Sequence, residues 1–139
     1  MKAEHFDALV VGAGPAGSIA ATVLARGGAR VALVDKASFP RDKACGDLIG
    51  PRGVQLLSEL GIAIPGALRV DDMIVVGPTS RRVRLPCYPG RTYPGHGVAM
   101  RRVDFDAALR TTALDAGAEA FVSRATDPLS GDRGLEGFT

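Results

Sequence analysis

The sequence predicts an α/β fold with a central parallel sheet. Two short apolar runs, residues 6–11 and 30–34, have the length of strands that are buried on both faces of such a sheet. Between them, residues 18–26 carry small and aliphatic side chains at helical spacing and end at Gly27 and Gly28, where a helix commonly stops. Strand, helix and strand in this order predict one βαβ unit with a right-handed crossover.

The middle of the chain predicts one more helix and a group of short strands. After a polar loop over residues 38–50, Pro51 stands where a helix commonly begins and Gly61 where one commonly ends. Turn residues then separate three short apolar or alternating runs, which indicate strands. These runs are residues 72–76, 82–85 and 97–100. They predict a β-rich insertion over about residues 70–101.

The last part of the chain predicts a helix, a strand and part of a hairpin. Residues 103–116 form an amphipathic pattern that ends at Gly117, and a strand is expected over 119–123. The buried face of the helix is expected to comprise Phe105, Leu109, Ala113 and Ala116. Residues 129–139 indicate a turn and one half of a hairpin. With no linker or repeat along the chain, residues 1–139 are expected to form one partial domain.

Composition excludes several classes of function. The 139 residues carry a net charge of +2 and no Trp, which argues against nucleic-acid binding. Cys45 and Cys87 are too few for a disulfide scaffold and have no neighbouring metal-ligand pair, so no metal site is expected. No run approaches the roughly 20 apolar residues that span a bilayer. We therefore expect a cytoplasmic protein with at most peripheral membrane contact.

A glycine motif follows the first predicted strand and opens the first predicted helix. Gly12, Gly14 and Gly17 form the pattern G-x-G-x-x-G. In this context the first glycine permits a tight turn, the second lets a pyrophosphate approach the backbone, and the third lets the helix lie close to the strand. The free N–H groups of the helix N-terminus favour phosphates. The motif therefore predicts a dinucleotide site.

Asp35 ends the second predicted strand at about the distance, roughly 20 residues, that this fingerprint requires. Its carboxylate can accept hydrogen bonds from both hydroxyls of an adenosine ribose and would repel a 2′-phosphate. The alternative is a purely structural turn with Asp35 as a surface carboxylate. The fingerprint does not distinguish FAD from NAD, because both present the same ADP half.

Three further segments carry a resemblance to a known family. KASFPRDKACGD (Lys36–Asp47), the following GPRGVQLL, and RRVDFDAAL with DAGAE after it resemble the N-terminal half of the geranylgeranyl reductase family of flavoproteins. The similarity is greatest to actinobacterial-type members described as menaquinone or polyprenyl reductases. The family also resembles aromatic-ring hydroxylases and flavin-dependent halogenases. This chain departs from the family pattern at Lys43, where many members have Tyr, and at Leu48, where Gly is common.

The resemblance implies a Rossmann-like FAD-binding domain that is incomplete at the C-terminus, with FAD as cofactor. It places Arg41, Cys45 and Gly46 in a loop beside the flavin, Arg102 on the cofactor and Ala125 near the adenine. No catalytic side chain is expected, and the alternative to a place beside the flavin is that Cys45 is a packing residue. The expected cofactor-binding residues are Gly12, Ala13, Gly14, Pro15, Ala16, Gly17, Asp35, Lys36, Arg41, Cys45, Gly46, Arg102 and Ala125.

The function implied by the resemblance is reduction of isoprenoid carbon–carbon double bonds by a full-length enzyme, with hydride from reduced FAD. The substrate domain and the family's second flavin-binding segment are expected beyond Thr139, in a missing C-terminal half. The chain alone is expected to bind FAD weakly and not to catalyse. Two alternatives stay open at this point: part of a flavin monooxygenase or halogenase, and a nucleotide-binding module without catalysis.

Overall fold

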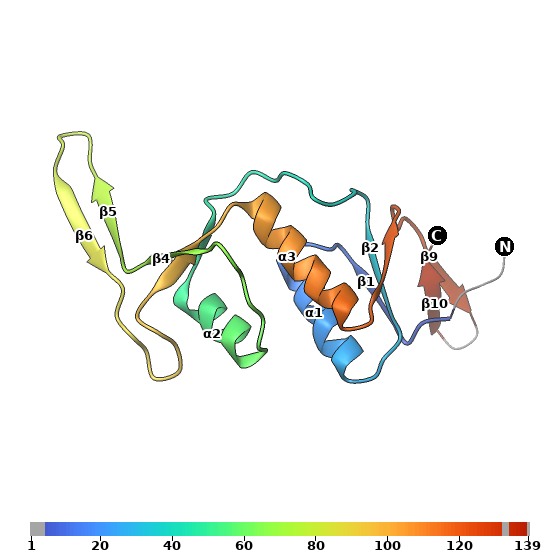
Figure 1. The fold of residues 1–139 in the computed structure, drawn as a ribbon. Coiled ribbons are helices and arrows are strands. Elements are labelled where there is room, and N and C mark those ends of the chain that lie inside the picture. The colour runs from blue at the N-terminus through green and yellow to red at the C-terminus, as the bar shows by residue number, and fades with distance from the viewer. Residues whose placement is uncertain (1–4, 132–133, 139) are drawn as a thin grey trace. The chain divides into compact units, whose positions relative to one another are not determined.

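The computed structural model describes residues 5–131 and 134–138 and divides into two compact units (Figure 1). The first unit comprises residues 1–42 and 103–139, and the second comprises residues 43–102. Each unit contains its own β-sheets.

The first unit is built on a three-stranded parallel sheet. Its strands are β1 (Ala8–Val11), β2 (Val31–Asp35) and β8 (Glu119–Val122), in the order β1-β2-β8. Ala8 lies opposite Val31, and Ala32 lies opposite Glu119. The predicted parallel sheet is therefore confirmed, and the strand after the third predicted helix joins the βαβ unit beside β2.

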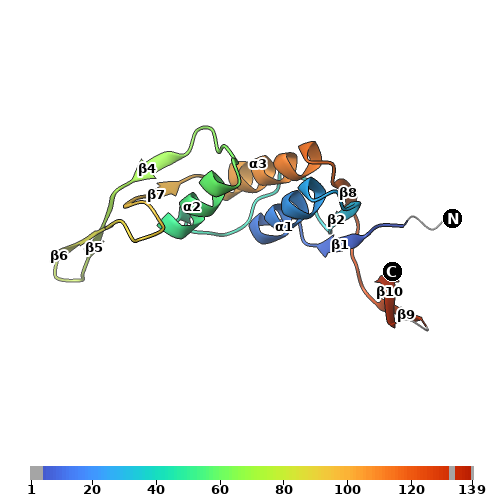
Figure 2. The same cartoon turned by 90° about the horizontal axis from the view of Figure 1, so that it is seen from below.

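Two helices cover one face of this sheet (Figure 2). They are α1 (Pro15–Arg26) and α3 (Arg102–Asp115). Small side chains at their contacts let both helices lie close to the strands, with Ala21 and Ala113 fully buried. The core between helices and sheet comprises Ala13, Ala21, Val31, Leu33, Ala113 and Ala118.

Burial of β1 on both faces, which its continuous apolar run predicts, is not observed. Ala8 and Val10 pack against the core, so the alternation of a strand directs Leu9 and Val11 to the other face. Leu9 is 39% exposed and Val11 56% exposed. The prediction was wrong because both helices lie on the same side of the sheet.

The end of the described chain also differs from expectation. β9 (Pro128–Gly131) and β10 (Gly134–Phe138) pair antiparallel, so both strands of a hairpin are present and not one half. Gly134 lies opposite Gly131, and the register shifts between Leu135 and Gly137. Glycines at the hairpin end weaken the strand pattern in the sequence, which hid the second strand.

The second unit contains one helix and five short strands. The elements are β3 (Leu48–Ile49), α2 (Pro51–Glu59), β4 (Leu68–Val70), β5 (Asp72–Val76), β6 (Arg82–Pro86) and β7 (Gly97–Ala99). One antiparallel sheet has the order β3-β7-β4, and β5 and β6 form a separate hairpin. The three predicted strands and the helix at Pro51 are confirmed. β3 and β4 were missed because runs of two or three residues carry no readable period.

Helix α3 buries most of the face that its sequence predicts. Phe105, Leu109 and Ala113 are buried, whereas Ala116 follows the last helical residue and is only partly buried. Within the described residues, no helix is long and apolar enough to cross a membrane.

Replacing Gly17 with Ala is expected to destabilise the first unit. An added Cβ would lie 1.8 Å from the carbonyl oxygen of Gly12, so helix and turn would have to separate. We expect a loss of about 1–3 kcal/mol in the free energy of unfolding, as for other overpacked sites, measured by urea denaturation. Gly46→Ala is the matched control, because no atom lies within 4 Å of its added Cβ. Equal midpoints for the two variants would contradict this interpretation.

Candidate functional site

The three glycines of the turn between β1 and α1 differ in what requires them. The backbone geometry requires two of them, whereas the third leaves space for a ligand. Gly12 has φ +100, a conformation that other residues rarely adopt, and Gly17 lies against the Gly12 carbonyl. Gly14 has neither restriction. A Cβ added to it would meet only Nη2 of Arg41, at the ordinary contact distance of 3.5 Å. The missing side chain at Gly14 therefore leaves open space at the start of α1.

Helix α1 presents its N-terminus at this turn. Pro15 is its first residue and has no N–H to satisfy. The hydroxyl of Ser18 is buried and donates to the carbonyl of Ala13 at 3.1 Å, which holds the turn against the helix. The amides of the first helical turn have no acceptor within the helix, and the helix dipole adds partial positive charge there. This end of α1 suits an anionic group.

The Asp35 carboxylate is fixed between this turn and the end of β2. Its Oδ2 accepts from the amide of Ala13 at 2.8 Å, and its Oδ1 accepts from the amide of Ala37 at 2.9 Å. A carboxylate has about four acceptor sites, so each oxygen keeps one for another donor. Asp35 is thus held in place without losing its capacity to bind hydroxyl groups.

A pocket of about 290 Å³ adjoins Asp35. Its lining residues are Val11, Gly12, Val34, Asp35, Lys36, Ser123, Arg124 and Ala125. Four of the residues predicted from the sequence are among them, including Ala125. Ser123 and Arg124 were missed, although they follow β8, whose carboxyl end lies beside that of β2. The carboxyl ends of neighbouring parallel strands are where α/β sheets bind ligands, so this signal could have found them.

Arg41 reaches the glycine turn from a segment that packs on α3. Its Nη2 lies 3.3 Å from Oδ2 of Asp106, a carboxylate that is fully buried, and the Arg41 side chain is 18% exposed. Its guanidinium also lies over the ring of Phe39, 4.8 Å from the centroid, and Arg110 lies 5.3 Å from the same centroid. Asp106 was missed as a site residue because nothing in the sequence pairs it with a residue so far away.

Cys45, Asp47 and Arg102 come together in the second unit. The side chain of Asp47 accepts from the amide of Arg102 at 2.9 Å, and the carbonyl of Asp47 accepts from the amide of Met100. A hydrogen bond from the Arg102 side chain, helped by backbone hydrogen bonds at Asp47 and Gly46, lowers the pKa of the exposed Cys45 thiol. The structure thus joins Cys45 and Arg102, which the sequence predicted separately, and adds Asp47 as the residue that fixes them.

The expected site residues are divided between the two units of the chain. The glycine turn, Asp35, Lys36, Arg41 and Ala125 belong to the first unit, whereas Cys45, Gly46 and Arg102 belong to the second. Their roles in holding a cofactor stay predictions. Among the described residues, no group of three or more His, Cys, Asp or Glu side chains is close enough to hold a metal ion.

Comparison with known proteins decides which dinucleotide domain this is. Residues 5–67, which include the glycine turn, Asp35 and the loop with Cys45, match the family model described as FAD binding domain. Over these residues the chain is similar to an FAD-binding domain. The features above fit that cofactor: open space at Gly14, free amides at the start of α1, and spare acceptor sites on Asp35 beside a pocket.

Two relatives that match most of this chain are named as reductases. The chain is 44% identical over 115 residues to menaquinone reductase of Mycolicibacterium smegmatis, covering 81% of this chain and 28% of the relative. It is 40% identical over 117 residues to geranylgeranyl diphosphate reductase of Rhodobacter capsulatus, covering 82% of this chain and 27% of the relative. The chain therefore spans little more than a quarter of the length of these relatives.

A solved structure shares the fold. A geranylgeranyl bacteriochlorophyll reductase-like protein from Thermoplasma acidophilum superposes with a TM-score of 0.77 at 27% identity, covering 96% of this chain and 34% of that one. The predicted FAD-binding, Rossmann-like fold is thereby confirmed for the chain.

Loss of the Arg41 charge is expected to destabilise the FAD-binding domain. In Arg41→Gln the buried Asp106 carboxylate loses its cationic partner, which we expect to lower the free energy of unfolding by about 3 kcal/mol in urea denaturation. Arg110→Gln is the matched control, because it also removes a guanidinium from Phe39, a contact of about 0.5–1 kcal/mol. Equal losses in the two variants would show that stacking, not the ion pair, carries the effect.

Cys45 is expected to ionise below the ordinary pH range of a thiol because of Arg102. In a Cys87→Ser background, the rate of alkylation by iodoacetamide should rise with pH at a midpoint below the usual thiol pKa of about 8.5. Removing the donor in Arg102→Gln destabilises the thiolate and should move the midpoint up. Arg101→Gln, which changes the neighbouring arginine, should leave it in place. An unchanged midpoint in Arg102→Gln would refute the assignment.

Proposed function

We propose that this chain forms the adenosine-diphosphate-binding part of the FAD site in a reductase of isoprenoid carbon–carbon double bonds. The observation that carries the proposal is the Asp35 carboxylate, fixed by the Ala13 amide to the glycine turn at the start of α1. It sets a hydroxyl-binding group and an anion-binding helix end side by side, as an adenosine ribose and a diphosphate require. The names of the relatives support the reductase activity.

Within this proposal each group of residues has its own task. Gly12, Ala13, Gly14, Pro15, Ala16 and Gly17 form the turn that receives the diphosphate. Asp35 accepts from the ribose hydroxyls, and Lys36 and Ala125 line the pocket for the adenosine end. Arg41, held by Asp106, adds positive charge at the turn. These residues bind and orient the cofactor and move no proton.

The remaining predicted residues belong to the second unit, and we assign them to the flavin ring of the cofactor. Cys45 and Gly46 lie in one exposed loop, and Arg102 donates a hydrogen bond to the Cys45 thiol. When bound, FAD supplies hydride transfer, so no side chain of this chain has to act as a general acid or base. The task of this loop is to position the cofactor and to shape the space beside it.

We further propose that residues 1–139 are one partial FAD-binding domain with residues 70–101 as its insertion. The enzyme would act in the cytoplasm and meet its substrate at a membrane surface, because an isoprenoid chain partitions into lipid. The relatives' names, menaquinone reductase and geranylgeranyl diphosphate reductase, support a substrate of this class.

A cofactor titration tests the proposed function. Purified chain is titrated with FAD, NAD and NADP, and binding is followed by flavin fluorescence quenching or thermal shift. We expect selective binding of FAD, and a Kd at least about tenfold higher in Asp35→Ala, since hydrogen bonds to charged groups contribute about 1.5–3 kcal/mol.

Asp7→Ala is the matched control for this titration. Asp7 is also a carboxylate of the first unit that accepts from a backbone amide, that of Arg30 at 2.7 Å, but it does not line the pocket. Its loss should leave the affinity for FAD unchanged. Equal or tighter binding of NAD would refute the flavin proposal in favour of a nucleotide-binding module.

A further inference from the structure

Arg124 lines the pocket beside Asp35 and has no task in the site proposed above. It follows β8, the strand that pairs with β2. The amide of Ser123 donates to the carbonyl of Asp35 at 2.9 Å, so the backbone before Arg124 is fixed to the end of β2. The sheet therefore holds Arg124 and Asp35 at neighbouring strand ends, next to one pocket.

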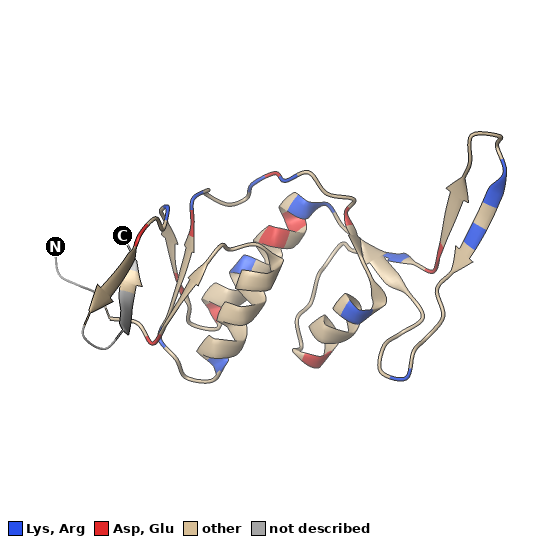
Figure 3. Cartoon of the chain, turned by 180° about the vertical axis from the view of Figure 1, so that it is seen from behind, with Lys and Arg blue, Asp and Glu red and all other residues tan. Residues whose placement is uncertain are grey.

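The lining of this pocket carries more positive than negative charge. Lys36 and Arg124 are its cations, and Asp35 is its carboxylate, which already accepts from two backbone amides. Figure 3 shows basic and acidic residues together at the carboxyl ends of these strands. Within residues 5–131 and 134–138, neither Lys36 nor Arg124 makes an ion pair. Both cations are thus available to a ligand.

The order of groups in a nucleotide decides which part of it meets this pocket. The lining includes Gly12 but not Gly14 or Pro15, where we place the diphosphate at the start of α1. A nucleotide with its ribose on Asp35 and its diphosphate at that helix end has its base on the remaining side of the ribose. A volume of about 290 Å³ is at the lower end of ligand pockets, about 300–1,000 Å³, which suits one end of a dinucleotide.

The walls of the pocket suit a flat aromatic ring. Val11, Val34 and Ala125 provide apolar surface. An arginine guanidinium is planar and weakly hydrated, and it stacks on the faces of nucleic-acid bases. A lysine ammonium is a compact, strongly hydrated charge without a plane. Of the two cations, Arg124 is therefore the one that can cover a ring face.

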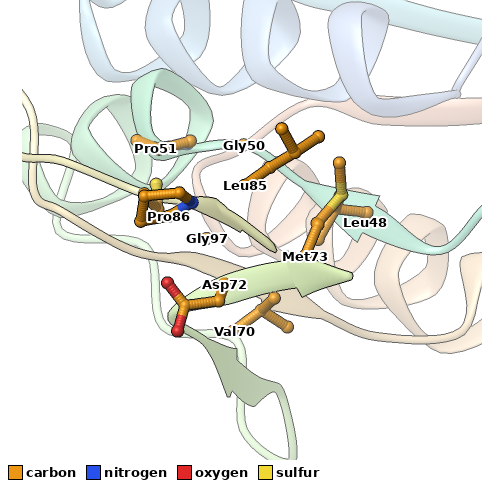
Figure 4. A pocket seen from close by; sticks show the side chains of 10 residues that line it. Leu48, Gly50, Pro51, Val70, Asp72, Met73, Leu85, Pro86 and Gly97 are labelled. Carbon is orange, nitrogen blue, oxygen red and sulfur yellow. The ribbon is translucent and has the colours of Figure 1, made fainter. Parts of the chain in front are cut away.

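The pocket of the second unit lacks this combination of groups (Figure 4). It has a volume of about 270 Å³ and is lined by Leu48, Gly50, Pro51, Val70, Asp72, Met73, Leu85, Pro86, Cys87 and Gly97. Figure 4 shows Met73 and Leu85 near Leu48, with the Asp72 carboxylate turned to the other side. That carboxylate accepts from Arg84. Nothing in this lining distinguishes one apolar ligand from another, so we assign it none.

We propose that Arg124 stacks its guanidinium on the adenine ring of the cofactor and thereby favours a purine nucleotide. The inference deepens the proposed function and rests on it for the places of the ribose and the diphosphate. A purine presents a larger face to the guanidinium than a pyrimidine does, so the contact adds more affinity for adenine. Arg124 binds the cofactor and moves no proton.

Titrations of the purified chain with ADP and UDP, followed by calorimetry, test this assignment. Arg124→Ala should raise the Kd for ADP about fivefold or more, the loss expected for a stacked cation. The Kd for UDP should rise less, so the preference for ADP over UDP should shrink. A residue that only attracts the diphosphate, or only holds the fold, would change both affinities alike, and that result would overturn the proposal.

Two further variants separate the plane of the guanidinium from its charge. Arg124→Lys keeps the charge without the plane and should lose most of the ADP affinity that Arg124→Ala loses. Arg26→Ala is the matched control, because Arg26 is also an exposed arginine of the first unit but does not line the pocket. Its ADP affinity should stay within twofold of the wild type. Wild-type affinity in Arg124→Lys would overturn the stacking.

The NMR signal of the Arg124 Nε–H group gives a direct readout, and its absence from the spectrum of Arg124→Ala assigns it. Because a ring current shields groups above an aromatic face, this signal should move upfield when ADP binds. Saturation with ADP without such a shift would contradict the stacked geometry.

An FAD titration of the same samples separates this inference from the proposed function. Binding of FAD that depends on Asp35 but not on Arg124 overturns the stacking alone. Tighter binding of NAD than of FAD, with both weakened in Arg124→Ala, supports the stacking and overturns the flavin proposal. Wild-type chain that binds neither ADP nor FAD overturns both.

Discussion

The hydrogen bond from the Ala13 amide to the Asp35 carboxylate is the constraint on which the first unit depends. At 2.8 Å it joins the turn after β1 to the end of β2, so two strands and the start of α1 share one fixed point. Gly12 and Gly17 make this geometry possible, through a positive φ and a close approach of helix to turn. In the function that we propose, the carboxylate that holds the turn is also the one that keeps acceptor sites for a ribose.

Positive charge at this turn comes from two sources, and only one of them is balanced by a neighbouring negative charge. The amides at the start of α1 are fixed by the helix, and their partial charge is not neutralised within it. Arg41 carries a full charge, but it lies 3.3 Å from the fully buried Asp106, which balances much of it. In the site that we propose, the helix terminus is thus the main attraction for a diphosphate. The ion pair mainly sets where the Arg41 guanidinium stands, over Phe39 and beside Gly14.

The sequence could predict the features that depend on the order of neighbouring segments along the chain. A strand, a glycine turn, a helix and an acidic residue at the end of the next strand follow one another, and each was found at its expected place. Besides strands that are too short or too rich in glycine to show a pattern, the misses depend on partners that are distant in sequence. The ion pair of Asp106 is with the distant Arg41, exposure of Leu9 and Val11 depends on which face the helices cover, and the pocket residues Ser123 and Arg124 depend on β8 pairing with β2.

Two apolar faces of the described structure are exposed, and they differ in the elements that adjoin them. On β1, Leu9 and Val11 are exposed on a strand of four residues, and Val11 also lines the pocket that adjoins Asp35. On the β5–β6 hairpin, cross-strand pairs continue the apolar surface away from a pocket whose walls are held by a sheet and by α2. The face on β1 is the second side of a strand whose first side packs on the core, whereas the hairpin face belongs to a separate two-stranded ribbon.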